Sequence, residues 1–211
     1  MKIIQQILEH QIVSIIRGAK PSEVIDIAEA LYKGGVKLLE ITLNSENAFE
    51  VIKKVSARFE NKMLIGAGTV LSVEDVLQVI DCGAKFIISP SVDFDVIKTT
   101  KEKGAISLPG AYTPTEIVNA YKAGADIIKV FPASTPKYIK ELRAPLSHIP
   151  LMPTGGISLE NIAEFQEAGA IAFGIGTSLV DTKKEINDAY LNEITRKAEL
   201  FTKAINHYQL Q

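Results

Sequence analysis

Short apolar runs recur along the chain, and each follows a segment with the hydrophobic spacing of a helix. Five of the runs begin directly after a glycine, namely Gly35, Gly83, Gly104, Gly124 and Gly169. Glycine suits the end of a helix because it adopts the left-handed conformation of a C-terminal cap without strain. The runs are short and rich in β-branched residues, which is typical of strands buried on both faces.

Further apolar runs at residues 12–16, 63–67 and 150–153 bring the predicted strands to eight. The strand centres are about 23 residues apart on average, which is the length of one compact strand–loop–helix–loop unit. Between them, Pro21, Thr113 and Ser158 mark helix starts. The last helix is predicted over residues 183–206.

Eight strands alternating with eight helices predict an α/β fold, a single (β/α)₈ TIM barrel with a short N-terminal helix. No linker or low-complexity stretch divides the repeats, so residues 1–211 are predicted to form one barrel domain. A doubly wound open sheet is the alternative arrangement of the same elements.

Composition narrows the functional class. With 25 acidic and 23 basic residues, the formal charge is −2, which argues against nucleic-acid and anionic-membrane partners. Cys82 is the only cysteine, so an internal disulfide is excluded. Glu9 and His10 interrupt the N-terminal apolar stretch, and prolines and glycines break the longest uncharged run, residues 144–159. We therefore expect a soluble cytoplasmic protein.

Candidate chemistry lies where the predicted strands end, because barrel enzymes carry their active sites at the carboxyl ends of the strands. The strands themselves are almost wholly apolar, yet ionisable and hydroxyl groups gather at these ends. In chain order they are Arg17, Glu40 with Thr42, Thr69, Ser89 with Pro90, Pro109 with Gly110, Lys129 with Phe131, residues 154–156, and Gly176 with Thr177.

Lys129 and Glu40 each interrupt an apolar strand. Burial removes water from a lysine ammonium and lowers its pKa, which makes the neutral amine a nucleophile towards a carbonyl. The alternative is a lysine that snorkels from the strand end or forms a structural ion pair. Glu40 is a candidate general acid/base beside this lysine, or the counter-ion of Lys129 or Arg17.

Two glycine-containing loops follow the seventh and eighth predicted strands, at residues 153–158 and 174–179. This position is the usual phosphate site of the barrel fold. Adjacent glycines let backbone N–H groups approach an anion, and a following helix start adds a favourable dipole. The alternative is that these glycines only form tight turns. Their occurrence after both expected strands favours the phosphate interpretation.

Several other chemistries are not expected. Residues 66–69 and 174–177 lack the third glycine of a dinucleotide fingerprint, and the chain has no Walker loop or nucleophile-elbow serine. His10, His148 and His207 lack metal-ligand spacing. We expect no cofactor and no metal, and we interpret Cys82 as a core residue.

Taken together, these motifs resemble the 2-keto-3-deoxy-6-phosphogluconate aldolase / 4-hydroxy-2-oxoglutarate aldolase family, class I aldolases of the Entner–Doudoroff pathway. The resemblance covers about residues 12–180. It rests on residues 34–42 (GGVKLLEIT), 66–70 (GAGTV), 88–90 (ISP), 129–132 (KVFP) and 153–157 (PTGGI), which occur in this order.

The resemblance implies a Schiff-base role for Lys129 and an acid/base role for Glu40. It implies that the pyruvyl pocket is lined by Thr69, Pro90 and Phe131, with Thr154 beside it. It implies that the phosphate is held by a separate set, Gly155, Gly156, Gly176 and Thr177. Many relatives have an arginine for the substrate carboxylate where this chain has Asn44. Arg17 is predicted to supply that guanidinium instead.

The implied reaction is lyase chemistry in carbohydrate metabolism. A phosphorylated keto acid, 2-dehydro-3-deoxy-6-phosphogluconate, is cleaved to pyruvate and glyceraldehyde 3-phosphate, and 4-hydroxy-2-oxoglutarate is a further expected substrate. The galactonate epimer is an alternative substrate. A phosphate-binding barrel isomerase or epimerase and a non-catalytic sugar-phosphate binder are alternatives of other classes. The resemblance also implies a homotrimer.

Overall fold

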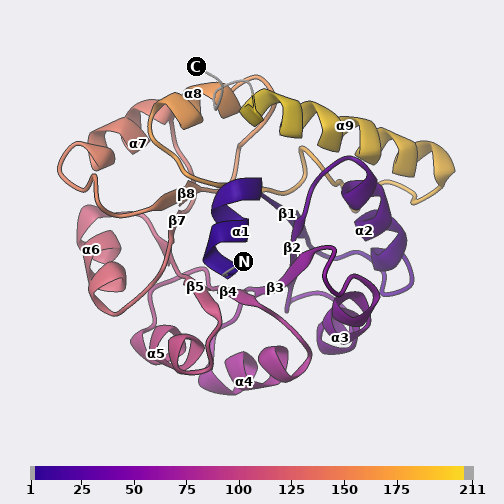
Figure 1. Cartoon of the computed structure of the whole chain (residues 1–211), viewed down its shortest axis with the longest axis horizontal. Coiled ribbons are helices and arrows are strands. Elements are labelled where there is room, and N and C mark those ends of the chain that lie inside the picture. Colours follow the sequence, from indigo (N-terminus) through magenta and orange to yellow (C-terminus); the bar gives the residue numbers. More distant parts are fainter. Residues whose placement is uncertain (1–2, 207–211) are drawn as a thin grey trace.

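The computed structural model describes residues 3–206, so His207 lies outside the described residues. Its helices are α1 (Ile3–His10), α2 (Val24–Lys33), α3 (Ala48–Arg58), α4 (Val73–Asp81), α5 (Phe94–Glu102), α6 (Pro114–Lys122), α7 (Pro136–Arg143), α8 (Ile162–Glu167) and α9 (Asp188–Asn206). Its strands are β1 (Ile12–Ile16), β2 (Leu38–Thr42), β3 (Leu64–Gly68), β4 (Phe86–Ile88), β5 (Ile106–Leu108), β6 (Gly110–Ala111), β7 (Ile128–Val130), β8 (Leu151–Pro153) and β9 (Phe173–Ile175). Helices α2 to α9 surround the strands, and α1 lies over the centre of the ring (Figure 1).

All of the strand pairs are parallel, and they form two sheets. The six-stranded sheet has the order β5-β4-β3-β2-β1-β9, and the three-stranded sheet has the order β6-β7-β8. A single parallel bridge between Thr154 and Gly174 links β8 to β9. The predicted α/β fold with a curled parallel sheet is confirmed, whereas the closed eight-stranded barrel stays a prediction.

The fifth predicted strand corresponds to β5, and a short strand that was not predicted, β6, follows Pro109. β5 pairs with β4, and β6, which follows the proline, pairs with β7. Proline has no N–H to donate, so a strand ladder cannot continue through it. The Pro109 carbonyl still accepts from the Lys129 amide at 3.0 Å, and the Gly110 amide donates to the Ser89 carbonyl at 2.9 Å. The chain therefore passes from one sheet to the other at this residue.

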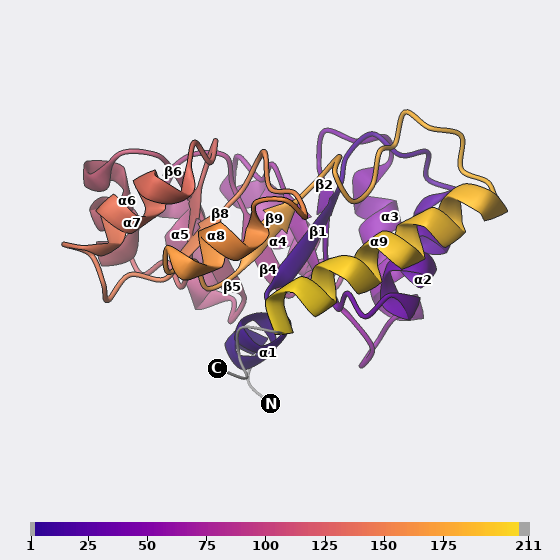
Figure 2. The same cartoon turned by 90° about the horizontal axis from the view of Figure 1, so that it is seen from above.

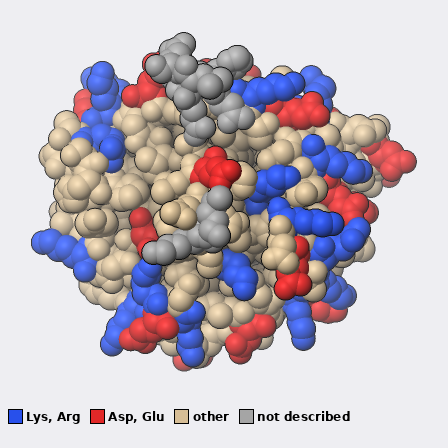
Figure 3. Space-filling model, in the orientation of Figure 1, with Lys and Arg blue, Asp and Glu red and all other residues tan. Residues whose placement is uncertain are grey.

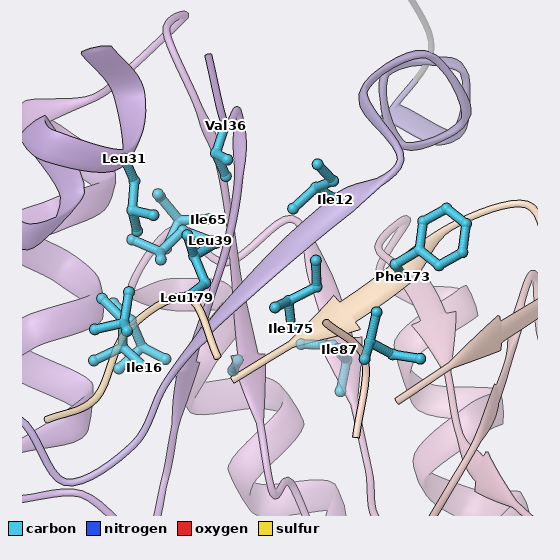
Figure 4. Close-up of a cluster of buried hydrophobic side chains, with 14 of the residues drawn as sticks. Ile12, Ile16, Leu31, Val36, Leu39, Ile65, Ile87, Phe173, Ile175 and Leu179 are labelled. Carbon is cyan, nitrogen blue, oxygen red and sulfur yellow. The ribbon is translucent and has the colours of Figure 1, made fainter. Parts of the chain in front are cut away.

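Alternate residues of each strand face opposite sides. In β2, Leu39 and Ile41 belong to the larger cluster of buried apolar side chains, which packs the strands against the surrounding helices (Figure 4). Leu38 belongs to a second cluster that includes Val13 of β1 and Ile7 of α1. Helix α1 thus covers the interior at the end where the strands begin (Figure 2). Glu40 lies two residues after Leu38, on the same face of β2, so its side chain also faces the interior, nearer the carboxyl ends of the strands.

Three helix starts differ from the predictions. Helix α2 begins at Val24, after a turn that contains Pro21. Helix α8 begins at Ile162 with Asn161 at its N-cap, so Ser158 is not the cap residue; the Asn161 side chain instead accepts from the Ser158 amide. Helix α9 begins at Asp188 rather than near residue 183: Asp181 Oδ1 accepts from the Lys183 amide in a turn, and Asn187 Oδ1 accepts from the Tyr190 amide, as an N-cap residue does. The Thr113 cap of α6 is confirmed, and Glu116 completes a capping box.

Basic and acidic side chains are interspersed over the face on which α1 lies (Figure 3). In residues 3–206, none of the helices is long and apolar enough to cross a membrane.

Candidate functional site

A cavity of about 420 Å³ opens at the carboxyl ends of the strands, and both the strands and the loops that follow them line it. Most of the predicted site residues line it, namely Arg17, Lys129, Phe131, Thr154, Gly155, Gly156, Gly176 and Thr177. Its lining does not include Glu40, Thr69 or Pro90. The cavity therefore joins residues from β1, β7, β8 and β9 that are far apart in the sequence.

Lys129 is buried, with 4% of its surface exposed, in the middle of β7. Its neighbours Ile128 and Val130 belong to the cluster that packs against the helices, so Lys129 faces the interior. Its Nζ atom lies 5.0 Å from the centre of the Phe131 ring. The amine thus reaches the cavity from an apolar strand, which is the environment that favours a nucleophilic lysine.

Glu40 is also buried, with 1% of its surface exposed, and neither carboxylate oxygen has a hydrogen-bond partner. Burial raises the pKa of this carboxyl, while the nearby charges of Lys129 and Arg17 oppose that rise. A carboxyl group with a raised pKa exchanges protons nearer to neutral pH, as a general acid/base requires.

No salt bridge within residues 3–206 includes Glu40, Lys129 or Arg17. No ion pair therefore joins these groups within 4.0 Å, the distance that defines a salt bridge. At longer range the charges of Lys129 and Arg17 still act on Glu40, whose two oxygens have no hydrogen-bond partner.

Glycines provide the space around these groups. An added Cβ at Gly68 would overlap Glu40 Oε1 and lie 2.6 Å from its Cδ. An added Cβ at Gly174 would overlap Thr154 Oγ1, a buried atom that itself has no hydrogen-bond partner. Both side chains are thus accommodated only because the neighbouring strand lacks a side chain at that position.

The two predicted anion-binding loops lie side by side at one edge of the cavity. Gly155 and Gly156 have φ values of +88° and +75°, which L residues rarely adopt. The Ser178 hydroxyl joins the loops by donating to the Ile157 carbonyl at 2.6 Å. Glycine backbone and hydroxyl groups from both loops line the cavity, a set that suits a phosphate group.

Thr69 and Pro90 follow the carboxyl ends of β3 and β4 and lie outside the cavity lining. Thr69 has a φ of +57°, which is strained for a β-branched residue. The Pro90 carbonyl packs against Gly110 so closely that a Cβ there would overlap it.

Several lining residues were not predicted, namely Ile15, Ile157, Ser158, Gly174, Ser178, Val180 and Thr182. Ile15 follows from the alternation of β1, because it lies two residues before Arg17. Ser158 and Ser178 belong to the predicted glycine loops. Val180 and Thr182 come from the segment between β9 and α9, where the sequence has no motif.

Residues 3–206 contain no group of three or more histidine, cysteine, aspartate or glutamate side chains that could hold a metal ion. Cys82 is half-buried and packs against the larger core cluster. Burial raises the pKa of its thiol, which disfavours the nucleophilic thiolate.

Comparison with known proteins identifies similar chains. A family model described as KDPG and KHG aldolase matches residues 3–197. A probable 2-dehydro-3-deoxy-6-phosphogalactonate aldolase of Rhizobium meliloti (strain 1021) is 38% identical over 175 residues, which is 82% of each chain. A 2-dehydro-3-deoxy-phosphogluconate aldolase of Haemophilus influenzae is 33% identical over 198 residues, 92% of each chain. A solved structure described as native KDPGal superposes with a TM-score of 0.88 and 32% identity, covering 95% of this chain and 96% of that chain.

Proposed function

We propose that this chain, which belongs to the KDPG and KHG aldolase family, cleaves a 6-phosphorylated 2-keto-3-deoxy sugar acid to pyruvate and glyceraldehyde 3-phosphate. The observation that carries the proposal is the pair of buried ionisable side chains, Lys129 and Glu40, that face one interior without forming a salt bridge. An amine and a carboxyl in this relation are what imine-based aldol cleavage requires.

The reaction begins when the neutral Lys129 amine attacks the C2 carbonyl. Uptake of one proton from solvent and loss of water give a protonated imine, which accepts the electron pair of the C3–C4 bond as that bond breaks. Glu40, directly or through a water, takes the proton of the C4 hydroxyl, and the aldehyde product leaves. The enamine that remains is protonated at C3, and hydrolysis of the imine releases pyruvate and regenerates the lysine.

The ends of the substrate are assigned by charge. Arg17 holds the carboxylate, because a guanidinium can form a bidentate, charge-assisted contact that Asn44 cannot. Gly155, Gly156, Gly176 and Thr177 hold the phosphate. The keto acid lies between these ends, against Thr69, Pro90, Phe131 and Thr154.

The gluconate and galactonate substrates differ in a hydroxyl configuration and yield the same two products. The gluconate substrate is our assignment from the sequence motifs. The galactonate substrate is the second candidate, because a relative at 38% identity and a structure with a TM-score of 0.88 carry that name. The ratio of kcat/KM for the two phosphorylated acids decides between them.

The remaining features of the proposal concern the whole molecule. We assign the two sheets to one closed (β/α)₈ barrel, which the Thr154–Gly174 bridge and the Ile171–Leu151 backbone hydrogen bond (3.0 Å) support. The family resemblance further implies a cytoplasmic homotrimer, and sedimentation equilibrium measures the number of subunits.

Borohydride trapping tests the proposed function. Pyruvate plus borohydride is expected to add one reduced pyruvyl group, located by peptide mass analysis on Lys129, and EDTA is expected to leave cleavage unchanged. No adduct, or an adduct on another lysine, contradicts the assignment. An isomerase, an epimerase or a non-catalytic binder has no need of the imine and gives no adduct.

A further inference from the structure

The backbone that carries Arg17 lies beyond the ladder of hydrogen bonds that orders β1. Strand β1 ends at Ile16, and Gly18 adopts a φ of +72°. The Arg17 side chain is exposed and lines the cavity. Neither strand pairing nor a salt bridge fixes this segment, so its position depends on other contacts.

A chain of hydrogen bonds connects Ile16 and Gly18, the two residues that flank Arg17, and so closes a ring with the backbone of Arg17. The Gly18 amide donates to Ser45 Oγ at 2.9 Å. Ser45 Oγ and Thr42 Oγ1 are 3.1 Å apart, and the Thr42 hydroxyl donates to the Ile16 carbonyl at 3.4 Å. Each hydroxyl has one proton, so Ser45 must donate to Thr42. The ring runs without a break from residue 18 back to residue 16.

A third hydroxyl binds the same segment from the opposite end of the chain. The Thr182 hydroxyl donates to the Arg17 carbonyl at 2.7 Å. Thr182 follows Asp181, whose backbone is held by the buried Tyr190 of α9. The Tyr190 hydroxyl accepts from the Asp181 amide at 2.7 Å and donates to its carbonyl at 3.1 Å.

We propose that Thr42, Ser45 and Thr182 are positioning residues for the proposed aldol cleavage, because their hydroxyls fix the Arg17 backbone so that its guanidinium meets the substrate carboxylate. This inference rests on the proposed function and on the carboxylate role of Arg17. It assigns a task to Thr42, the last residue of the motif at residues 34–42, and to Ser45 and Thr182, which lie outside the motifs. The three residues act on affinity for the keto acid and leave the phosphate loops unaffected.

The test replaces Thr182 with valine, which keeps the shape of the side chain and removes the donor. The rate of pyruvate trapping by borohydride is measured against pyruvate concentration, together with the dissociation constant for inorganic phosphate. Loss of one hydrogen bond is expected to raise the pyruvate concentration for half-maximal trapping by about two- to tenfold. The maximal trapping rate and the dissociation constant for inorganic phosphate are expected to stay unchanged. Thr182→Ser retains the donor and is expected to restore the wild-type dependence.

Thr195→Val is the matched control. The Thr195 hydroxyl also lies within hydrogen-bond distance of the carbonyl of a distant residue, Ala30 at 3.0 Å, and of the Leu191 carbonyl in its own helix at 3.1 Å, but it joins α9 to α2 away from the cavity. We expect this variant to lower the melting temperature without changing the pyruvate dependence. A purely structural effect of Thr182→Val would give the same pattern as this control and overturn the inference.

A double-mutant cycle with Arg17→Gln separates positioning from direct contact, since Thr182 itself lines the cavity. If Thr182 acts through Arg17, Thr182→Val has no further effect on pyruvate dependence in the Arg17→Gln background. Additive effects overturn the inference while the Lys129 adduct in the wild-type protein still supports the proposed function. Absence of that adduct in the wild type refutes the proposed function itself.

Discussion

Gly68→Ala is expected to damage catalysis by adding a single methyl group beside Glu40. The φ of Gly68 lies outside the left-handed range, so alanine introduces no backbone strain and acts only through contact. The new Cβ would lie 2.6 Å from Glu40 Cδ and 2.7 Å from its Cγ, and would overlap Oε1. Because real Cβ contacts are longer than 3.0 Å, the carboxyl must move by about 1 Å.

Two magnitudes follow from this displacement. Overpacking a well-filled interior costs about 1–3 kcal/mol, which corresponds to a fall in melting temperature of about 2–12 °C for a chain of this size. Misplacement of a catalytic group by about 1 Å lowers the rate roughly 10²-fold. Calorimetry measures the first effect and the steady-state release of pyruvate measures the second. Borohydride trapping on Lys129 is expected to persist.

The matched background is Glu40→Ala, which removes the carboxyl that the methyl group meets. In this background Gly68→Ala is expected to cost little further stability, because the overlapping atoms are gone, while the cleavage rate stays low. Equal destabilisation in both backgrounds would show that the methyl group meets something other than Glu40. Wild-type turnover in the single variant would refute the placement of Glu40 beside the reacting atoms.

Two further substitutions address the charged groups. Glu40→Gln is expected to slow cleavage roughly 10²–10⁴-fold, the usual range for general acid–base catalysis, with trapping retained. Burial raises the pKa of Glu40, so the wild-type fold loses stability as pH rises above the ordinary carboxyl range. The melting temperature of Glu40→Gln should therefore exceed that of the wild type at neutral pH, and the difference should vanish in acid; a difference that does not change with pH contradicts the raised pKa. Arg17→Lys is expected to weaken the binding of pyruvate by about 1.5–3 kcal/mol and to leave the affinity for inorganic phosphate unchanged. The opposite pattern would show that Arg17 binds the phosphate rather than the carboxylate.

The repeat pattern predicted the strands well because strands buried on both faces leave a strong signal of apolar runs after glycine. It could not predict the change of sheet at Pro109, since the apolar run continues on both sides of the proline. The start of α9 was missed for a similar reason. Residues 183–187 carry helix-compatible side chains, but Asp181 holds the Lys183 amide in a turn and Asn187 caps the helix at its actual start.

The cavity was predicted where polar residues interrupt or directly follow apolar strands, as with Lys129 in β7 and Arg17 after β1. Thr182 could not be found in this way, because it lies outside any strand and its partner is close to the other end of the sequence. Gly68 and Gly174 belong to motifs that the sequence made visible. Their contacts with Glu40 and Thr154 depend on strand register, which a single sequence does not specify.

The pairing of β1 with β9 has a consequence for the order in which this protein is made. Strand β1 leaves the ribosome shortly before β2, which pairs with one of its edges. Its other edge pairs with β9, where Ile12 meets Phe173, and so remains without this partner until the residues between the two strands have been synthesised. An apolar strand with an open edge is a template for pairing with other chains. Growing chains therefore carry an aggregation-prone edge throughout the synthesis of that interval, and β9 both covers the edge and adds Gly174 to the lining of the cavity.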